Sequence, residues 1–424
     1  MVTKEYRLLK AFEYRIYPNI EQRNQINQHF GAVRWVYNFG LETKIKAWTE
    51  FKKTVSRFDI QAQLPKLKQQ PETEWLKTIN SQSLQAGLEN LEKSYINFFR
   101  RIKTNKNPGF PKFKSKHNPR QSFQVPQHVS VDFESSYITL PKIDPIKIRF
   151  HRPFTGIIKT ITVKQSTTKK YFVSILVETS VEPKLKRRPV PNTTIGIDLG
   201  IKDLVVLSTG EKISNPKTLN KYKFKLVQTQ QNLSKKVKGS NNRIKAKLVL
   251  SKVHERISNI RKDFLHKLSS QLTTENQISC LVIEDLNVSG MMKNRKLARF
   301  IGDCSWSEFV RQLQYKADWN GINLIKIGRF EPSSKTCSVC GTVNQNLTLG
   351  DRTWTCSRCL VVHDRDINAA INIRNFGTGF KTNQTIPVER RDFKPVENQT
   401  ATSTRLRVVA SHSSMKQEAI AFRQ

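Results

Sequence analysis

The sequence predicts an α+β protein of several domains, in which a small β-barrel with a helical insert precedes a mixed α/β domain that carries a cysteine ribbon. The chain has 424 residues, enough for two or three domains. Short β-type runs flank two amphipathic helices before a basic, proline-containing linker at Lys184–Pro191. After that linker, apolar strands end in acidic residues and two CxxC pairs follow. We therefore expect a domain boundary near residue 190.

The first half combines strand and helix patterns. Tyr6–Tyr17 alternates as a strand does, and Pro18-Asn19 ends it. Ser122–Glu178 contains further short β-type runs, such as Ile157–Val163 and Tyr171–Val177, joined by a turn at Ser166–Lys170. Between these β regions, apolar residues recur at three- and four-residue steps and predict two amphipathic helices with a core-facing stripe. The stripes are Ile26, Phe30, Val33, Tyr37, Leu41, Ile45 and Trp48, and then Leu84, Leu88, Leu91, Tyr95, Phe98 and Ile102.

The second half begins with a mostly apolar strand at Thr193–Gly200, whose hairpin partner is Leu204–Leu207 with a turn at Thr209-Gly210. Two further buried strands follow at Ile278–Ile283 and Ile322–Ile327. Between these two strands we expect a helix from Trp306 to Asn320. Ser305 with Glu308 fits a capping box at its start, and Asn320-Gly321 fits a helix stop. Gly377–Gln424 is rich in Thr, Asn, Ser and Gln without lasting periodicity, so we expect it to be mostly disordered.

The charge balance indicates a polyanionic partner. Lys and Arg number 73 against 34 Asp and Glu, a formal net charge of +39. The sequence pI of about 10.2 lies above the level of roughly 9 that is typical of nucleic-acid-binding domains. No segment reaches the roughly 18 apolar residues of a membrane helix, and Met1–Pro18 lacks the apolar core of a signal peptide. We expect a soluble, intracellular protein.

Two segments concentrate that charge. Arg100–Lys116 interleaves basic side chains with Phe110 and Phe113, which suits a nucleic-acid backbone with stacked bases, although a plain solvated loop is the alternative. Lys221–Lys262 carries many Lys and Arg with Glu255 as its only acid, and it predicts a basic helical hairpin.

Four of the six cysteines form two CxxC pairs, Cys337/Cys340 and Cys356/Cys359. The fifteen residues between the pairs suit a two-knuckle zinc ribbon with tetrahedral thiolate ligands. Four thiolates leave no open position, so we expect a structural Zn²⁺; His363 could in principle replace one thiolate. Cys280 and Cys304 are isolated and predicted to be ordinary core residues.

Three carboxylates occupy positions that rigid elements would hold. Asp198 ends an apolar strand, Glu284 ends another, and Asp366 precedes a predicted helix start. Such a set can ligate Mg²⁺, and phosphodiester hydrolysis uses a pair of metal ions roughly 3.5–4 Å apart. Asp285 and Asp364 are adjacent competitors for these roles. Gly196–Gly200 also resembles a phosphate loop of actin-fold ATPases, but the sequence offers no second such loop, and neither the net charge nor the ribbon favours an ATPase.

With these residues in view, the chain resembles the TnpB family of RNA-guided DNA endonucleases encoded by insertion sequences, which are relatives of type V CRISPR effectors. The resemblance extends over about residues 6–375. The matching segments are Tyr14–Pro18, Gly31–Asn38, Gly109–Phe113, Gly196–Asp203, Glu284–Leu286, Pro332–Cys337 and His363–Ala370.

The resemblance implies a RuvC-like nuclease of RNase H fold, with Asp198, Glu284 and Asp366 as catalytic residues and Mg²⁺ ligands. It implies a β-barrel wedge domain at 1–18 and 119–190, a helical recognition insert at 19–118, the nuclease domain at 191–330 and 364–376, and the zinc ribbon at 331–363. It also implies a guide RNA from the transposon end, double-stranded target DNA cut beside a short flanking motif, and a monomer in a bacterial, nucleoid-associated complex.

The chain departs from the family at Leu360, which stands where glycine is usual after the second cysteine pair. The family's flanking-motif readers fall near Phe58, Gln61, Ser81, Gln82, Gln85 and Gln124, and they imply no particular motif here. Some relatives have lost catalytic carboxylates and act as repressors, whereas all three are present here. An RNA-guided repressor or transposition accessory factor without cleavage remains the alternative function. A strand-joining transposase fits less well, since no clear tyrosine-nucleophile motif with paired histidines is present.

Overall fold

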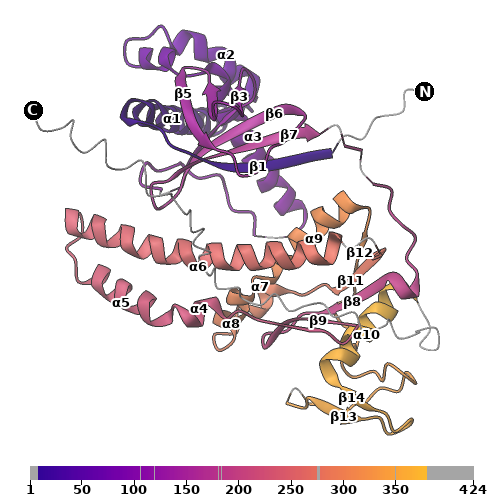
Figure 1. Cartoon of the computed structure of the whole chain (residues 1–424). Helices are drawn as coiled ribbons and strands as arrows, with labels where there is room; N and C mark the ends of the chain where they lie inside the picture. The colour runs from indigo at the N-terminus through magenta and orange to yellow at the C-terminus, as the bar shows by residue number, and fades with distance from the viewer. Residues whose placement is uncertain are drawn as a thin grey trace, which may run out of the picture.

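The computed structural model describes residues 8–105, 107–118, 120–179, 181–182, 184–274, 277–348 and 350–379. They form two lobes joined by the segment after strand β7, with the cysteine ribbon at the far end of the second lobe (Figure 1). The start of the first predicted strand and nearly all of the predicted tail lie outside the described residues.

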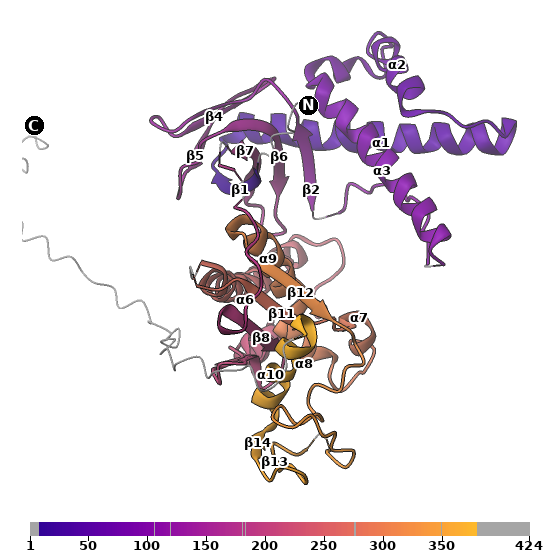
Figure 2. The same cartoon turned by 90° about the vertical axis from the view of Figure 1, so that its right-hand side faces the viewer.

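The first lobe contains a seven-stranded antiparallel sheet in the order β2-β6-β7-β1-β5-β4-β3. The chain enters β1 and leaves it for the helices, then returns to build the rest of the sheet. The predicted barrel is therefore a curled sheet whose two edges are β2 and β3 (Figure 2). Its strands are β1 (Leu8–Ile16), β2 (Gln121–Val125), β3 (Ser130–Asp132), β4 (Tyr137–Leu140), β5 (Ile143–Arg149), β6 (Ile157–Gln165) and β7 (Tyr171–Thr179).

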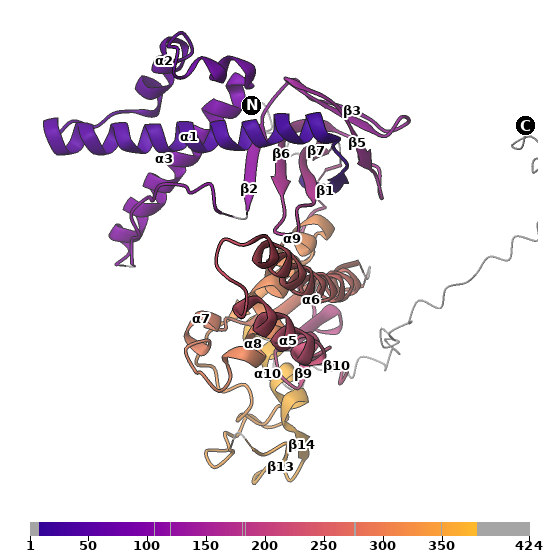
Figure 3. The ribbon, with the colours of Figure 1, turned by 90° about the vertical axis from the view of Figure 1, so that its left-hand side faces the viewer.

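The predicted helical insert is confirmed between β1 and β2. Asn19 and Gln22 form a capping box that starts the first long helix, because each side chain satisfies a backbone N–H left free at the helix start. The expected apolar stripe is buried from Ile26 to Leu41, whereas Trp48 is exposed. The helices are α1 (Ile20–Phe51), α2 (Arg57–Leu67), the 3₁₀ turn η1 (Glu74–Thr78) and α3 (Ser81–Lys103). Figure 3 shows α1 crossing α3 beside the sheet.

The basic segment predicted to bind nucleic acid ends in a loop after α3 that packs in part against the helices. Phe110 packs edge-on against Tyr95 and Phe98 of α3, at ring-centroid distances of 5.7 and 5.4 Å. Lys114 lies over the ring of Tyr37 at 3.9 Å. Phe113 is 56% exposed and Phe110 is 47% exposed, so both rings keep open area for stacking.

The second lobe is built on a five-stranded sheet in the order β10-β9-β8-β11-β12. β8 (Thr194–Asp198), β11 (Cys280–Glu284) and β12 (Asn323–Ile327) run parallel, and β9 (Asp203–Leu207) and β10 (Lys212–Ser214) complete the sheet as antiparallel strands. The predicted pairing of the first strand with Leu204–Leu207 is confirmed, but the turn at Thr209-Gly210 connects β9 to β10 and not β8 to β9. Cys280 and Cys304 are both buried in the core, as predicted.

Helices cover both faces of this sheet. The predicted basic hairpin is confirmed as α5 (Lys223–Ser234) and α6 (Asn241–Thr274). The short helices α4 (Thr218–Lys221), α7 (Val288–Met291) and α8 (Ala298–Cys304) lie near its loops, with η2 (Pro191–Thr193) before β8. α9 (Trp306–Asn320) packs with α6 on one face, and α10 (Arg365–Thr378) covers the other (Figures 1 and 2).

The expected capping box of α9 is wrong. Ser305 adopts a left-handed backbone with φ of 56°, and its hydroxyl donates to the carbonyl oxygen of Gly302 instead of capping α9. Glu308 accepts from Arg311 and Gln312. The predicted stop is confirmed, because Gly321 ends the helix with φ of 68°.

Glu255 joins the basic hairpin to the first lobe. Its carboxylate accepts from the hydroxyl of Thr168 at 2.8 Å and from Lys170 Nζ at 2.7 Å, both in the turn between β6 and β7. The only acid of this basic stretch is therefore a contact between lobes. A second contact between the lobes is made by Lys10 of β1, which stacks over Trp319 of α9 at 4.9 Å. Within the described residues, no helix is long and apolar enough to span a membrane.

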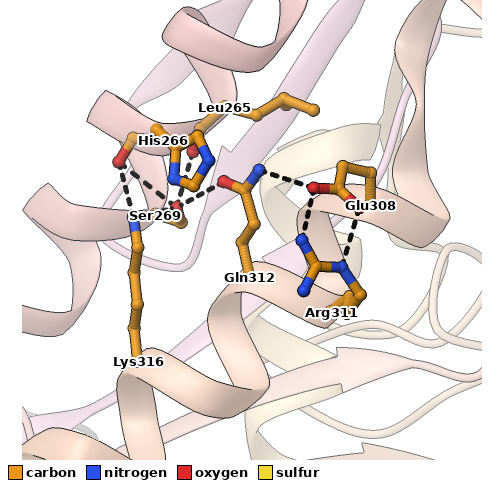
Figure 4. Close-up of polar contacts among 7 residues, drawn as sticks. All are labelled: Leu265, His266, Ser269, Glu308, Arg311, Gln312 and Lys316. Atoms are coloured by element: carbon orange, nitrogen blue, oxygen red, sulfur yellow. Dashed lines mark hydrogen bonds and ion pairs between the residues drawn. The ribbon is translucent and has the colours of Figure 1, made fainter. Parts of the chain in front are cut away.

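A buried lysine lies between α6 and α9. Lys316 is 7% exposed, and its Nζ donates to the carbonyl oxygen of His266 and to the hydroxyl of Ser269 (Figure 4). It also donates to the hydroxyl of Ser270. Within the described part of the chain no carboxylate lies within 4.0 Å of it. Burial lowers the pKa of Lys316 to about 8, since the charged ammonium is poorly solvated there.

Replacing this lysine tests that cost. Between about pH 8 and 10.5, Lys316 is deprotonated in the folded protein but still protonated in the unfolded chain, where its pKa is ordinary. Because the unfolded state binds the extra proton, the free energy of unfolding rises with pH through that range. Lys316→Met should remove this rise and be equal to or about 1–2 kcal/mol more stable than the wild type at pH 7. Urea unfolding of both proteins at pH 7.5, 9 and 10 measures the difference. A marked loss of stability at pH 7 would show that the three hydrogen bonds outweigh desolvation.

Candidate functional site: an acidic edge beside a four-cysteine cluster

Asp198 and Glu284 lie at the same edge of the second sheet. β8 and β11 pair in parallel with Ile197 opposite Ile283, so the next residue of each strand leaves the sheet at neighbouring positions. Both strands are short, and the four residues before each carboxylate are buried. The local sequence therefore fixes each carboxylate at a rigid strand end.

Asp366 reaches this edge from the first turn of α10. Asp364 is the N-cap of that helix, because its Oδ1 accepts from the backbone N–H groups of Asp366 and Ile367 at 3.1 Å each. Asp364 also pairs with Lys212 at 2.6 Å. Of the adjacent competitors, Asp364 is thus a helix cap, and Asp285 pairs with Arg329 at 2.8 Å.

The seating of α10 on β8 depends on Gly196. A Cβ at this position would lie 2.0 Å from the carbonyl oxygen of Ala370 and 2.8 Å from the backbone nitrogen of Arg374. Only glycine allows the helix backbone to approach the strand so closely. This close contact sets how far the first turn of α10, and with it Asp366, stands from the strand end at Asp198.

The electrostatics of this edge show that the three carboxylates are close enough to interact. The pKa of Asp198 is raised to about 7, first by burial, then by the charge of Glu284 and then by that of Asp366. We call Asp198, Glu284 and Asp366 the acidic trio. Glu284 accepts from Ser333 Oγ at 2.5 Å, and Asp366 Oδ2 lies 3.6 Å from Arg352 Nη1. Within the described residues, the trio is a looser set than the cysteines, since its oxygens do not all lie within 4.8 Å of one another.

Such a donor set fits a hard divalent cation. Carboxylate oxygens are the ligands that Mg²⁺ prefers. A cation between them would offset both causes of the raised pKa of Asp198, its burial and the charges of Glu284 and Asp366.

The four cysteines converge as the sequence predicts. Their sulfur atoms all lie within 4.8 Å of one another, with Cys337 and Cys359 at 3.6 Å and Cys340 and Cys356 at 3.5 Å. Four thiolates at Zn–S distances of about 2.3 Å would have sulfurs about 3.8 Å apart in a regular tetrahedron. The cluster therefore fits Zn²⁺. His363 stands outside the four, with Nε2 3.0 Å from the sulfur of Cys337.

The two cysteine knuckles have the same backbone pattern. Gly341 N donates to the carbonyl oxygen of Cys337, and Leu360 N donates to that of Cys356. Both residues after the second cysteine adopt left-handed backbones, with φ of 77° at Gly341 and 59° at Leu360. Leu360 thus keeps the turn and the ligands, but in a conformation that suits glycine better. β13 (Thr353–Thr355) and β14 (Val362–Asp364) pair beside the second knuckle.

Two buried asparagines on α10 hold the first knuckle, and sequence reasoning did not single them out. Asn368 accepts from Ser338 N at 2.9 Å and donates to the carbonyl oxygen of Thr336. Asn372 donates to the carbonyl oxygens of Ser333 and Thr336. Two asparagines four residues apart on the buried side of α10 were the available signal. Through Ser333 this contact extends to Glu284, so the cysteine ribbon and the acidic trio form one unit.

A separate pocket lies on the helical insert. Its cavity of about 350 Å³ is lined by Phe58 and Gln61 of α2 and by Ser81 and Gln85 of α3. Four of the six positions where the family resemblance places flanking-motif readers therefore share one pocket. Gln82 instead bonds with Gln127 at 2.9 Å.

Comparisons with known proteins agree with this architecture. Residues 174–295 match the family model described as "Probable transposase" (OrfB_IS605), residues 306–373 the "Cas12f1-like, TNB domain", and residues 8–53 a "Helix-turn-helix domain". In the structure, residues 8–53 are instead strand β1 followed by the single helix α1.

Two relatives cover most of the chain. A Streptomyces pristinaespiralis protein named "Putative RNA-guided DNA endonuclease" is 41% identical over 86% of this chain and 88% of its own length. An Escherichia coli K12 protein, "Putative RNA-guided DNA endonuclease InsQ", is 33% identical over 86% and 91%. Among solved structures, Cas12f1 from a Cas12f1–sgRNA–target DNA complex aligns with a TM-score of 0.54 at 16% identity, covering 87% of this chain and 99% of that one. That likeness shows the fold.

The contact at Gly196 can be tested directly. Gly196→Ala should destabilise the second lobe by about 1–3 kcal/mol or more, because the new methyl group meets helix backbone that cannot yield cheaply. Hydrogen exchange should show faster exchange at the start of α10. Gly31→Ala is the matched control, since its Cβ meets nothing closer than 3.8 Å and alanine favours a helix. Equal behaviour of the two variants would mean that α10 does not depend on this contact.

The turn at Leu360 gives a second test. Leu360 is 74% exposed, so Leu360→Gly loses little packing and relieves a left-handed conformation that costs an ordinary residue about 1–2 kcal/mol. The variant should release zinc to a competing chelator more slowly than the wild type. Gly341→Ala, at the equivalent turn with open space around its Cβ, should release zinc faster. Faster release from Leu360→Gly would contradict the assignment of strain to this turn.

Proposed function

The chain belongs to the TnpB family, and from this premise we propose that it is an RNA-guided, Mg²⁺-dependent endonuclease that cuts double-stranded DNA beside a short flanking motif. The observation that carries the proposal is the convergence of Asp198, Glu284 and Asp366 at one edge of the parallel sheet. The relatives' names support the same activity at 41% and 33% identity.

The acidic trio would hold the metal. When bound there, Mg²⁺ ions supply the charge that activates water and stabilises the leaving oxygen in phosphodiester hydrolysis. The chain's own part is to fix the ligands. β8 and β11 hold two carboxylates at rigid strand ends, α10 brings the third, and Ser333 orients Glu284 through its 2.5 Å hydrogen bond. The guanidinium of Arg352, in the ribbon, partly neutralises the charge of Asp366.

The lobes suggest a division of work. We assign 1–18 and 119–190 as a wedge domain, 19–118 as the recognition insert, 191–330 and 364–376 as a RuvC-like nuclease domain, and 331–363 as its zinc ribbon, although α10 continues to Thr378. A groove between the lobes, with a cavity of about 500 Å³, is lined by basic side chains from both, including Arg34, Lys169 and Lys247. Its charge suits the phosphate backbone of a guide RNA. The pocket at Phe58 and Gln85 is the proposed reader of the flanking motif.

Substitution of one carboxylate tests the proposal. The protein is purified with its copurifying RNA, which is sequenced so that a matched target with a randomised flank can be made. In Mg²⁺, Asp198→Ala should lower the rate of target cleavage by about 100- to 1,000-fold or more, a loss typical of removing a group that stabilises transition-state charge. Target binding should stay within a few-fold of the wild type.

Asp285→Asn is the control, because that carboxylate is paired with Arg329 and lies next to Glu284. It should cleave at nearly the wild-type rate. Cleavage by Asp198→Ala would refute the site assignment. Target binding without any cut product from the wild type would favour an RNA-guided repressor or accessory protein.

A further inference from the structure

A cationic pocket opens beside the acidic trio, outside the residues assigned so far. Its cavity of about 420 Å³ lies among the turn after β8, the loop after β10, helix α8 and the cysteine ribbon. Lys202, four residues after Asp198, and Arg352, which lies 3.6 Å from Asp366, both line it. A ligand in this pocket would therefore lie next to the proposed cleavage site.

The loop that carries Lys217 is held in place by two buried side chains. Asp303 is 8% exposed and accepts from Leu219 N with both carboxylate oxygens, each at 3.0 Å. Asn215 is 9% exposed; it donates to the carbonyl oxygen of Ile201 at 3.1 Å and accepts from Lys217 N at 3.0 Å. The pocket is thus preformed, and its loop is tied both to α8 and to the turn after the Asp198 strand.

The charge of the pocket suits an anion. Asp303 is the one acidic side chain among its lining residues, and it is already bonded to Leu219 and lies 3.7 Å from Arg261. In the described ranges, no carboxylate lies within 4.0 Å of the charged groups of Lys202, Lys217 or Arg299. Lys217 also has a left-handed backbone with φ of 46°, a conformation that lysine rarely adopts and that is often found at functional sites.

An aromatic side chain completes the pocket. Phe300 of α8 lines the cavity and is 51% exposed. An exposed ring among cations, of which Lys202, Lys217 and Arg299 form no ion pair in the described ranges, is the combination that binds single-stranded nucleic acid, where the cations contact phosphate and the ring stacks on a base. A cavity of this volume is also within the usual range of roughly 300–1,000 Å³ for small-ligand sites.

We propose that this cationic pocket binds one phosphodiester group of the DNA strand being cut, adjacent to the scissile phosphate, with Lys217 and Arg299 on the phosphate and Phe300 against the neighbouring base. This proposal rests on the proposed endonuclease function. The pocket would hold the strand in register with the acidic trio, so Lys217, Arg299 and Phe300 are substrate-positioning residues.

The test pairs a protein change with a substrate change. Matched targets are made in which single phosphates near the cut carry an uncharged methylphosphonate, one position at a time. In the wild type, one position beside the scissile phosphate should slow cleavage by about 10-fold, the effect of losing roughly 1.4 kcal/mol. On the unmodified target, Lys217→Ala should cleave about 10-fold more slowly than the wild type. The methylphosphonate at the position that slows the wild type should slow this variant by less than about two-fold more. Lys267→Ala, an exposed lysine of α6 paired with Asp263, should behave as the wild type.

Two outcomes would overturn the proposal. One is cleavage by Lys217→Ala at the rate of the control variant. The other is that the effects of the substitution and of the methylphosphonate on the cleavage rate multiply at every modified position. If neither the wild type nor the variants cleave the target, the endonuclease proposal fails. A binding measurement on the intact protein–RNA complex then tests whether the pocket binds a DNA strand. Fluorescence anisotropy measures the binding of a short single-stranded DNA at several salt concentrations. The slope of log affinity against log salt should be smaller in magnitude by about 0.7 in Lys217→Ala and unchanged in Lys267→Ala. An unchanged slope in Lys217→Ala rejects the pocket.

A free nucleotide is the other source of the same chemistry. Deoxyadenosine monophosphate is therefore titrated as a competitor against the oligonucleotide. Competition only at concentrations far above that of the oligonucleotide supports a strand site. Tighter binding of the mononucleotide than of the strand, lost in Phe300→Ala, would reassign the pocket to a free nucleotide.

Discussion

The parallel pairing of β8 with β11, covered by α10, is the constraint on which the rest of the second lobe depends. Ile197 lies opposite Ile283, so the next residues, Asp198 and Glu284, leave the sheet together. Gly196 then lets α10 approach to backbone contact, which brings Asp366 to the same edge. Asp198 is thereby buried beside two like charges, and its pKa is raised first by burial and then by the charges of Glu284 and Asp366, so this arrangement costs free energy. The packing of apolar strands and a helix must supply that free energy, since the carboxylates repel one another.

The cysteine ribbon belongs to this unit. It is inserted between β12 and α10, and the two buried asparagines Asn368 and Asn372 connect its first knuckle to the helix that carries Asp366. Ser333 extends the connection to Glu284, and Arg352 extends it to Asp366. A structural zinc would therefore stabilise the acidic trio indirectly. It would fix the ribbon, whose Ser333 and Arg352 contact Glu284 and Asp366. The same arginine lines the cationic pocket, which joins the ribbon to the proposed path of the strand.

In this chain of net charge +39, several acidic residues have structural roles. Glu255 links the basic hairpin to the turn between β6 and β7, Asp303 fixes the loop of Lys217, and Asp364 caps α10. Among the described residues, Lys202, Lys217 and Arg299 have no carboxylate within 4.0 Å and stay available to solvent or to a polyanion. Buried Lys316 is an exception, because it is solvated by three oxygens of α6 without a carboxylate among the described residues.

The sequence by itself determined most of the longer elements and the cysteine cluster, and it predicted the acidic trio. Apolar periodicity located α1, α3 and the three parallel strands, the CxxC spacing identified the cysteine cluster, and carboxylates at strand ends indicated the acidic trio. These are properties of a few neighbouring residues, so local patterns carry them. Only the tertiary structure decided the curled, open sheet, the left-handed Ser305 that replaced the expected capping box, the asparagine contacts of α10 and the pocket around Lys217. Each of these depends on backbone or side chains brought together from separate elements, often far apart in sequence, and such contacts form only when the elements pack.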